Sequence, residues 1–167
     1  MSEDQVTIVK TATNDDRERI QNLVFGVLAE YGLRPDLDGT DRDLNDIEAN
    51  YTNRGGLFEL IEDVDGKLLG TIGLYRMDAE TVELRKMYFA PHFRGKGHGQ
   101  ETVARAISNA RKMGFKKIYL ETASVLEAAV HIYKKSGFKP FGDKHTPRCD
   151  QGYVLMLVDG DDESATG

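Results

Sequence analysis

The feature that most constrains the fold of this chain is a strand-like run that ends in a basic, glycine-rich turn and passes directly into a helical pattern. The run covers residues 81–90, the turn covers 94–100, and the helical pattern continues to Met113. Glycines let the backbone turn sharply and approach an anion closely, so that successive N–H groups point at it. A helix that starts there adds its first unpaired N–H groups and a partial positive charge. This order of elements predicts a phosphate-binding loop.

Two common phosphate-binding motifs are absent from this loop. The dinucleotide fingerprint G-x-G-x-x-G, started from Gly95 and Gly97, requires a glycine where the chain has Gln100. The pattern G-x-x-x-x-G-K-[ST] occurs nowhere in the chain. The loop does contain Arg-x-x-Gly-x-Gly, at Arg94, Gly97 and Gly99. Taken alone, that motif leaves a basic glycine loop without a ligand as the alternative.

A second segment, residues 120–138, reads as the end of a strand, a turn and a short helix. Ser124 and Glu127 have the S-x-x-E spacing of a capping box, which predicts that the helix begins near Val125. Gly137 stands where a helix ends in a left-handed cap. The residue after it opens another strand.

The two segments together resemble the GNAT superfamily of acetyl-CoA-dependent N-acetyltransferases. The loop matches the pyrophosphate-binding motif of that family. The second segment matches its Ala-x-x-x-Tyr-x-x-x-Gly-Phe signature at Ala129, Tyr133, Gly137 and Phe138. The resemblance implies the GNAT fold, an α/β structure of the α+β type. Its sheet is mixed and mostly antiparallel, with about seven strands, splayed fourth and fifth strands, and helices on both faces.

Hydrophobic periodicity and turn signals predict elements in the order β-α-α-β-β-β-α-β-α-β-β. We expect strands at 5–10, 57–63, 67–77, 81–90, 116–122, 138–142 and 152–158, with a hairpin turn at Asp65-Gly66. Helices are expected from Thr13 or Asn14 to Gly32, at 41–50, from Gly99 or Gln100 to Met113, and at 125–136. The chain, 1–167, is expected to be a single N-acetyltransferase domain with a core at 5–158 and a disordered acidic tail at 159–167.

Composition and charge exclude several classes of function. The net charge of −6 disfavours nonspecific nucleic-acid binding. No apolar run is long enough to span a bilayer and the N-terminus is acidic, so neither a membrane partner nor a secretory leader is expected. The single cysteine, Cys149, leaves no intrachain disulfide and favours a cytoplasmic location. His145 and Cys149 have no further ligands nearby in sequence, so no metal site is expected.

The resemblance also implies acetyl-CoA as co-substrate and indicates where it binds. Its pyrophosphate would lie on the glycine loop, and its pantetheine arm would pair with the backbone of the fourth strand as an added strand does. The residues expected to bind it are Met87, Phe89, Arg94, Gly95, Lys96, Gly97, His98, Gly99 and Gln100.

Acetyl transfer from a thioester to an amine needs a neutral amine and a proton for the departing thiolate. The resemblance assigns the general acid to Tyr133, whose phenol, with an ordinary pKa of about 10, stays protonated at neutral pH. Glu83 is the leading candidate for the base, acting through a water, and Glu121 on the next strand is its rival. The alternatives are that Tyr133 only packs its helix or positions the cofactor sulfur, and that both carboxylates only form ion pairs.

The strand that carries Glu83 supplies a further candidate. Alternation with a period of two would place Glu83, Arg85, Met87 and Phe89 on one face. Arg85 could then bind a substrate carboxylate with two hydrogen bonds, or it could only pair with Glu83. Glu121 is a second candidate for substrate binding.

The segment after the first helix is strongly acidic. It carries Asp36, Asp38, Asp41, Asp43, Asp46 and Glu48. One interpretation is a lid for a cationic acceptor; the preferred one is a solvated acidic helix without a function of its own.

The function implied by the resemblance is transfer of an acetyl group from acetyl-CoA to a primary amine of a small molecule by direct attack. Two alternatives remain: acetylation of a protein or peptide, and a non-catalytic acyl-CoA-binding module. Dimers are frequent in the family, so a homodimer is also considered. No motif in the chain identifies the acceptor amine.

Overall fold

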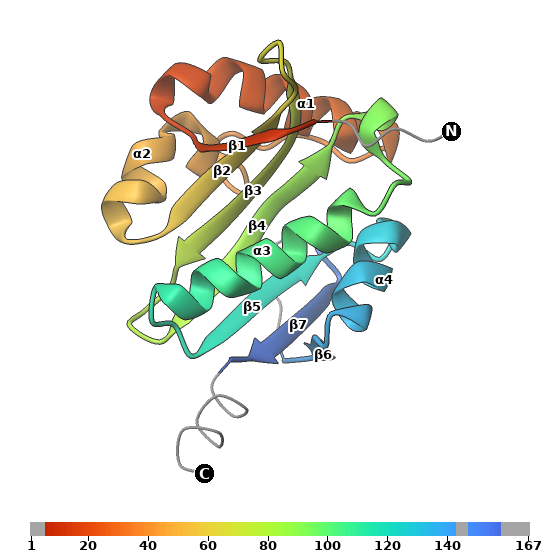
Figure 1. The fold of residues 1–167 in the computed structure, drawn as a ribbon. Coiled ribbons are helices and arrows are strands. Elements are labelled where there is room, and N and C mark those ends of the chain that lie inside the picture. The colour runs from red at the N-terminus through yellow and green to blue at the C-terminus, as the bar shows by residue number, and fades with distance from the viewer. Residues whose placement is uncertain (1–5, 143–146, 158–167) are drawn as a thin grey trace.

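Seven strands form one sheet in the computed structural model, which describes residues 6–142 and 147–157 (Figure 1). From edge to edge the strand order is β1-β2-β3-β4-β5-β7-β6. The strands are β1 (Ile8–Thr11), β2 (Leu57–Glu62), β3 (Leu68–Arg76), β4 (Thr81–Phe89), β5 (Lys117–Thr122), β6 (Lys139–Pro140) and β7 (Gln151–Met156). The α-helices are α1 (Arg17–Glu30), α2 (Ile47–Asn50), α3 (His98–Lys112) and α4 (Glu127–Lys135).

The sheet is mixed. Neighbouring strands are antiparallel except β4 and β5, which run parallel. The predicted mixed, mostly antiparallel sheet of seven strands is therefore confirmed. The β2–β3 hairpin turns at the expected place, where Gly66 takes a φ of +84° and the Asp63 carboxylate accepts hydrogen bonds from the N–H groups of Asp65 and Lys67.

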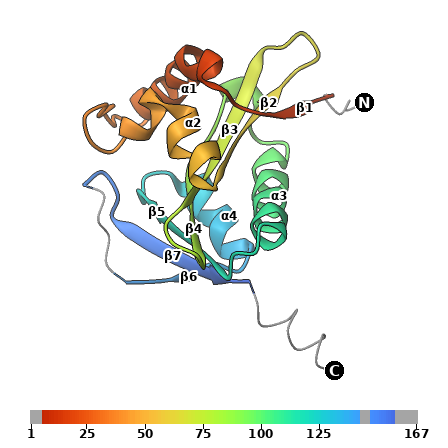
Figure 2. The same cartoon turned by 90° about the vertical axis from the view of Figure 1, so that its left-hand side faces the viewer.

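Helices cover both faces of the sheet, and Figure 2 shows α2 and α3 on opposite sides of it. On one face, Ile20 and Val24 of α1 and Ile47 of α2 pack against Phe58 and Leu60 of β2. On the other face lie α3 and α4. The buried cluster there includes Val82 and Leu84 of β4, Val103 and Ala106 of α3, and Tyr133 of α4.

The fourth and fifth strands separate along their length. They pair at Thr81↔Lys117, Val82↔Ile118 and Glu83↔Tyr119. Beyond Glu83, β4 continues to Phe89 and pairs with β3 alone among the described strands. Its other edge therefore presents N–H and C=O groups that no strand of the described sheet uses. The predicted splay is confirmed.

A β-bulge interrupts β4 close to this opening. Arg85 is opposite Gly73 of β3, but Tyr88 is opposite Thr71, so three steps along β4 match two along β3. Lys86 lies within the bulge with a φ of +56°, and among the described residues it is the one non-glycine with a positive φ. That conformation costs an L-residue roughly 1–2 kcal/mol.

The bulge overturns one prediction about side-chain direction. Because one extra residue shifts the alternation, Arg85 and Tyr88 share a face, while Met87 and Phe89 point to the other. Met87 and Phe89 accordingly pack with the α3–α4 cluster, and Tyr88 packs with the α1–α2 cluster. The expectation that Glu83, Arg85, Met87 and Phe89 share one face was wrong.

Two predicted helix starts also need correction. The α3 helix begins at His98, ahead of the expected start at Gly99 or Gln100. The α4 helix begins at Glu127, and its N-cap residue, Leu126, provides no side-chain hydrogen bond. Ser124 instead donates its hydroxyl hydrogen bond to the carboxylate of Asp150, 2.7 Å away, in the segment before β7. The predicted capping box is absent because this tertiary contact takes the serine.

The acidic segment is less helical than predicted. Residues Arg42–Asn45 form a 3-10 turn and α2 is only four residues long. The final strand pair is also shorter, because β6 is limited to Lys139–Pro140. Among the described helices, none combines the length and apolar character needed to cross a membrane. His145 and the predicted acidic tail lie outside the described residues.

Candidate functional site

Two cavities meet where β4 and β5 separate. The first, called here the charged cavity, has a volume of about 460 Å³ and is walled by residues of the 33–43 segment, β4, the end of β5, α4 and the 147–149 segment. The second, called the loop cavity, has a volume of about 530 Å³ and lies beside the glycine loop. Four residues line both cavities: Met87, Tyr88, Leu126 and Ala129. The two spaces therefore share a wall made by β4 and the start of α4.

The loop cavity contains most of the residues predicted to bind acetyl-CoA. Its lining includes Met87, Phe89, Arg94, Gly95, Gly97, His98, Gly99 and Gln100, whereas Lys96 does not belong to it. Gly95 and Gly97 have φ values of +77° and +86°, and a Cβ on either would meet nothing within 4 Å. The first α-helical bond of α3 joins the N–H of Glu101 to the carbonyl of Gly97. The earlier N–H groups of the helix are left for a ligand.

Gly99 serves the packing of two helices. A Cβ on Gly99 would stand 2.6 Å from Cδ1 of Ile132 on α4. The glycine therefore lets the first turn of α3 approach α4, which brings the glycine loop beside the helix that carries Tyr133.

Arg94 has a structural role within the loop. Its Nε donates to the carbonyl of Phe89 at 3.0 Å, and its two terminal nitrogens donate to the carboxylate of Glu30 at 2.7 and 2.9 Å. The hydrogen bond from Arg94 holds the pKa of Glu30 below its usual value. These contacts tie the loop to the end of β4 and to α1, and Glu30 balances the arginine charge.

Tyr133 lines the charged cavity from α4 and is only 5% exposed. Burial raises the pKa of its phenol well above the usual range. Its ring meets Phe138 edge-on, and no hydrogen bond links its hydroxyl to another side chain of the described residues. The phenol is therefore protonated at neutral pH, and its hydroxyl is not used by the fold.

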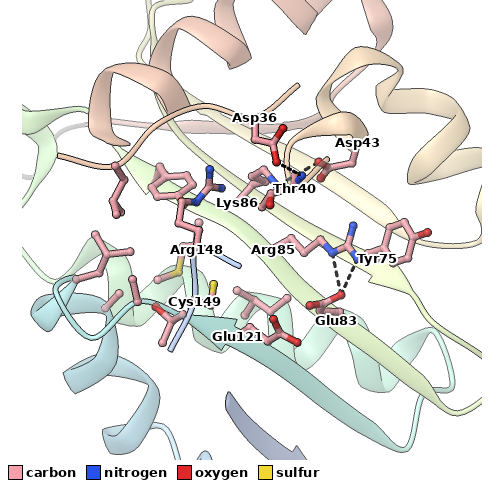
Figure 3. Close-up of a pocket in the computed structure, with 18 of the residues that line it drawn as sticks. Asp36, Thr40, Asp43, Tyr75, Glu83, Arg85, Lys86, Glu121, Arg148 and Cys149 are labelled. Carbon is pink, nitrogen blue, oxygen red and sulfur yellow. Dashed lines mark hydrogen bonds and ion pairs between the residues drawn. The ribbon is translucent and has the colours of Figure 1, made fainter. Parts of the chain in front are cut away.

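The two predicted carboxylates line the charged cavity together with Arg85, as Figure 3 shows. Glu83 is 3% exposed, and its Oε1 accepts a hydrogen bond of 2.8 Å from Nε of Arg85. The guanidinium of Arg85 also stacks on the ring of Tyr75, 3.7 Å from its centroid. Glu121 accepts a hydrogen bond of 2.8 Å from the hydroxyl of Tyr119. Glu83 and Arg85 therefore form the ion pair that the sequence analysis considered, and both side chains also line the charged cavity.

The acidic segment contributes buried charges to this region. Asp41 is fully buried and Asp43 nearly so, so the interpretation of a solvated acidic helix is wrong for these two residues. Asp41 accepts two hydrogen bonds from Arg148, at 2.8 and 2.9 Å. Nζ of Lys86 lies 3.1 Å from Oδ1 of Asp43. The hydroxyl of Tyr51 also donates to Asp43. Burial disfavours a charged carboxylate, and the cations that face these two aspartates offset that cost.

The sequence analysis missed Tyr88 and Lys86, and it did not predict the partner of Arg148. Tyr88 lines both cavities, and burial raises its pKa to about 12. Its position follows from the bulge, which no local signal in the sequence predicts. Lys86 and Arg148 pair with residues more than 40 positions away. A buried ion pair between residues so far apart leaves no pattern in the sequence, so it is recognised only once the fold is known.

Cys149 lines the charged cavity beside Arg148. Burial raises the pKa of its thiol to about 11, so at neutral pH the sulfur is protonated. That state suits a packing side chain and not a nucleophile. Within the described ranges, no group of three or more His, Cys, Asp and Glu side chains is placed to hold a metal ion.

Comparisons with known proteins agree with this geometry. Residues 24–138 match the acetyltransferase (GNAT) family. An uncharacterised N-acetyltransferase of Escherichia coli K12, YjgM, is 34% identical to this chain over 140 residues. The match covers 81% of this chain and 83% of the length of YjgM. The crystal structure of an acetyltransferase from Streptococcus agalactiae is similar with a TM-score of 0.82 and 26% identity, covering 90% of this chain and 98% of its own. The spermidine N-acetyltransferase of Vibrio cholerae, solved with CoA and spermine, has a TM-score of 0.66, 19% identity and coverage of 90% and 95%.

Proposed function

Because this chain belongs to the acetyltransferase (GNAT) family and is an N-acetyltransferase, we propose that it transfers the acetyl group of acetyl-CoA to a primary amine of a small molecule by direct attack. The observation that carries this proposal is the meeting of the two cavities at the unpaired edge of β4. One cavity suits a phosphate ligand, and the other contains a buried phenol and two carboxylates. Two substrates could therefore meet at Met87 and Tyr88.

The residues of the loop cavity fit acetyl-CoA. Positive-φ glycines with open space beside them and the first N–H groups of α3 suit a pyrophosphate. The free edge of β4 suits the amides of a pantetheine arm, which can pair with it as an added strand would. The similar spermidine N-acetyltransferase contains bound CoA. Acetyl-CoA supplies the thioester that reacts.

The proton transfers are assigned to side chains of the charged cavity. Tyr133 is proposed as the acid group, because its raised pKa keeps the hydroxyl protonated, so that it can donate a hydrogen bond to the departing thiolate. Glu83 is proposed as the base that removes a proton from the incoming ammonium through a water. Glu121 stands on the next strand as the rival. Arg85 neutralises Glu83 and is a candidate for binding a substrate carboxylate.

A small acceptor is favoured over a protein by the shape of the charged cavity. Its volume of about 460 Å³ is within the range of small-molecule sites. Residues 33–43 and 147–149 also form walls that a long peptide would have to pass. A protein acceptor and a non-catalytic acyl-CoA-binding module remain outcomes of the test. A cytoplasmic location, a metal-free reaction and a homodimer stay predictions from the sequence and its resemblance.

The first experiment is a calorimetric titration of the purified protein with acetyl-CoA, with NADH and ATP as controls for a general nucleotide site. We expect micromolar binding of acetyl-CoA and none of NADH. Free-thiol release with primary amines then tests turnover. Failure of the folded protein to bind acetyl-CoA would contradict the proposed function. Binding without thiol release from any amine or peptide would favour the non-catalytic module.

A further inference from the structure

Four charged side chains from three distant parts of the chain form one buried network beside the charged cavity. Asp41 precedes the 3-10 turn at 42–45, Asp43 lies within it, Lys86 lies in the β4 bulge, and Arg148 precedes β7. Nζ of Lys86 stands 3.4 Å from Asp41 and 3.1 Å from Asp43. Arg148 closes the network with its two hydrogen bonds to Asp41. Figure 3 shows Lys86, Asp43 and Arg148 around the same space.

The network is balanced in charge and in hydrogen bonds. Two carboxylates face two cations, and the side chains of Asp41 and Asp43 are 0% and 3% exposed. Asp41 also accepts from the N–H of Asp36. Buried charges of this kind are tolerated only when each has partners, and removal of one partner leaves the other charge uncompensated in the interior. The four residues therefore hold their positions together.

Lys86 links the network to the backbone of β4. Its left-handed conformation is unfavourable for a lysine. Two groups of contacts hold it there: its ammonium bonds with the acidic segment, and its carbonyl accepts a 2.7 Å hydrogen bond from the hydroxyl of Thr71. The same bulge directs Met87 toward the α3–α4 face and Tyr88 toward the α1–α2 face. The network thus stabilises the strand conformation that separates the two cavities.

The network joins two walls of the charged cavity and leaves the loop cavity untouched. Lys86, Asp43 and Arg148 all line the charged cavity. None of them belongs to the lining of the loop cavity. Arg148 additionally donates to the carbonyl of Arg34, so the 147–149 segment is attached to the 33–43 segment at two points. A change at Arg148, whose hydrogen bonds go to the 33–43 segment, should therefore alter the acceptor side selectively.

We propose that Asp41, Asp43, Lys86 and Arg148 are positioning residues that determine which amine the charged cavity accepts, by holding the 33–43 and 147–149 segments against β4. The inference rests on the proposed function, because it takes the charged cavity as the acceptor site. None of the four residues reacts. Their role is to fix the shape of a wall that is built from segments far apart in the sequence.

The test compares wild type with Arg148→Gln, which removes the charge and the paired hydrogen bonds to Asp41. Three quantities are measured: the calorimetric Kd for acetyl-CoA, the kcat and KM for a panel of amines (spermidine, lysine, aspartate and glycine), and hydrogen exchange of residues 33–43. We expect the KM of the best amine to rise at least tenfold, the preference among amines to flatten, and exchange of residues 33–43 to accelerate. The Kd for acetyl-CoA should stay within twofold.

A matched control exists on the other face of the sheet. Arg105 also donates two hydrogen bonds to a buried carboxylate, that of Glu59, at 2.8 and 2.9 Å, and it lines neither the charged nor the loop cavity. Arg105→Gln should leave the KM and the amine preference within twofold of wild type. Arg148→Lys, which keeps the charge but bonds Asp41 less well, should restore part of the lost selectivity. If Arg148→Gln does not fold, the Asp41→Asn/Arg148→Gln double variant replaces it, because it leaves no lone charge at that pair.

The outcomes separate this inference from the proposed function. Wild-type protein that does not bind acetyl-CoA would contradict the proposed function and remove the acceptor role with it. Active wild-type protein with unchanged amine preference in Arg148→Gln would overturn the network's role alone. If wild type binds acetyl-CoA but acetylates none of the amines, unchanged exchange of residues 33–43 in the variant would overturn it equally.

Discussion

At the scale of single residues, the two ionisable groups assigned to catalysis are set by different surroundings. Tyr133 is buried among apolar side chains, which raises its pKa and keeps its proton in place. Glu83 is equally buried, but Arg85 neutralises it across 2.8 Å. The phenol therefore keeps its proton at neutral pH, and the carboxylate lies beside a fixed positive charge.

Replacing Tyr133 with Phe removes the hydroxyl and keeps the ring that packs on Phe138. We expect kcat to fall roughly tenfold or more, since general acid catalysis contributes at least that much, with the Kd for acetyl-CoA unchanged. Tyr153→Phe is the matched control: that tyrosine is also buried, but its hydroxyl bonds Gln151 away from both cavities. Steady-state kinetics with calorimetry measure both. Full activity of Tyr133→Phe would remove this residue from the acid role.

The base can be identified by comparing Glu83→Gln with Glu121→Gln across pH. Loss of the true base should lower kcat by roughly a hundredfold near neutral pH. The loss should shrink as pH approaches about 10, where a simple alkylamine loses its proton without help. Rates measured from pH 7 to pH 10 give the comparison. A larger effect of Glu121→Gln would assign the base to Glu121, and equal, pH-independent effects would indicate a structural role for both.

At the scale of elements, the site depends on the passage from β4 through the glycine loop into α3. The loop is held at both ends, by Arg94 on Phe89 and Glu30 and by the close contact of Gly99 with Ile132. Positive-φ glycines between these points leave the N–H groups of the first helical turn exposed to the loop cavity. The two ends of the loop are therefore fixed by contacts, while the space beside Gly95 and Gly97 is open.

Replacing Gly97 with Asp should abolish acetyl-CoA binding, because it adds bulk and negative charge to the centre of the loop. Gly114→Asp is a matched control, since Gly114 follows the other end of α3 with a φ of +90° and also has nothing within 4 Å of an added Cβ. Both variants should lose similar stability from strain, of about 1–2 kcal/mol. Only Gly97→Asp should lose binding in calorimetry, and binding retained by that variant would show that the loop is not the site.

At the scale of the whole molecule, ion pairs connect the α1–α2 layer to the sheet. Burial alone would raise the pKa of Asp41, but the hydrogen bonds from Arg148 and the charge of Lys86 outweigh it and lower the pKa. The hydrogen bond from the N–H of Thr13, together with those from Arg19, outweighs partial burial and lowers the pKa of Asp16. Hydrogen bonds from Arg19 and Lys10 do the same for Glu62. These carboxylates bind protons less readily in the folded than in the unfolded state.

Stability should therefore be lost in acid. Because these folded pKa values lie below the unfolded values of about 4, the pairs contribute fully above pH 5, and their contribution falls as pH decreases through the folded pKa values. Urea unfolding at pH 7, 5, 4 and 3 should show a free energy of unfolding that is level from pH 7 to 5 and declines below. The decline should be smaller in Arg148→Gln, and an equal decline would contradict the role given to Asp41.

Much of the architecture could be predicted from the sequence because local patterns determine it. The alternation of β2–β4, the Asp65-Gly66 turn and the apolar stripe of α1 predicted their elements to within a few residues. The start of α4 was misplaced, since Ser124 bonds Asp150 rather than capping the helix. A capping motif is local, but the competing partner comes from a distant part of the chain.

The sequence by itself determined the glycine loop, the helix that carries Tyr133 and the succession of strands along the chain, because each depends on residues close together in the chain. The arrangement of those strands in the sheet was expected from the family resemblance. Only the tertiary structure decided the arrangement of side chains around the charged cavity. The bulge at Lys86 reversed the faces of Met87 and Tyr88, and the acidic segment became a partner for Lys86 and Arg148 instead of a solvated surface. Burial and charge pairing act between residues that are far apart in the sequence. The spacing of nearby residues therefore does not predict which partners the fold brings together.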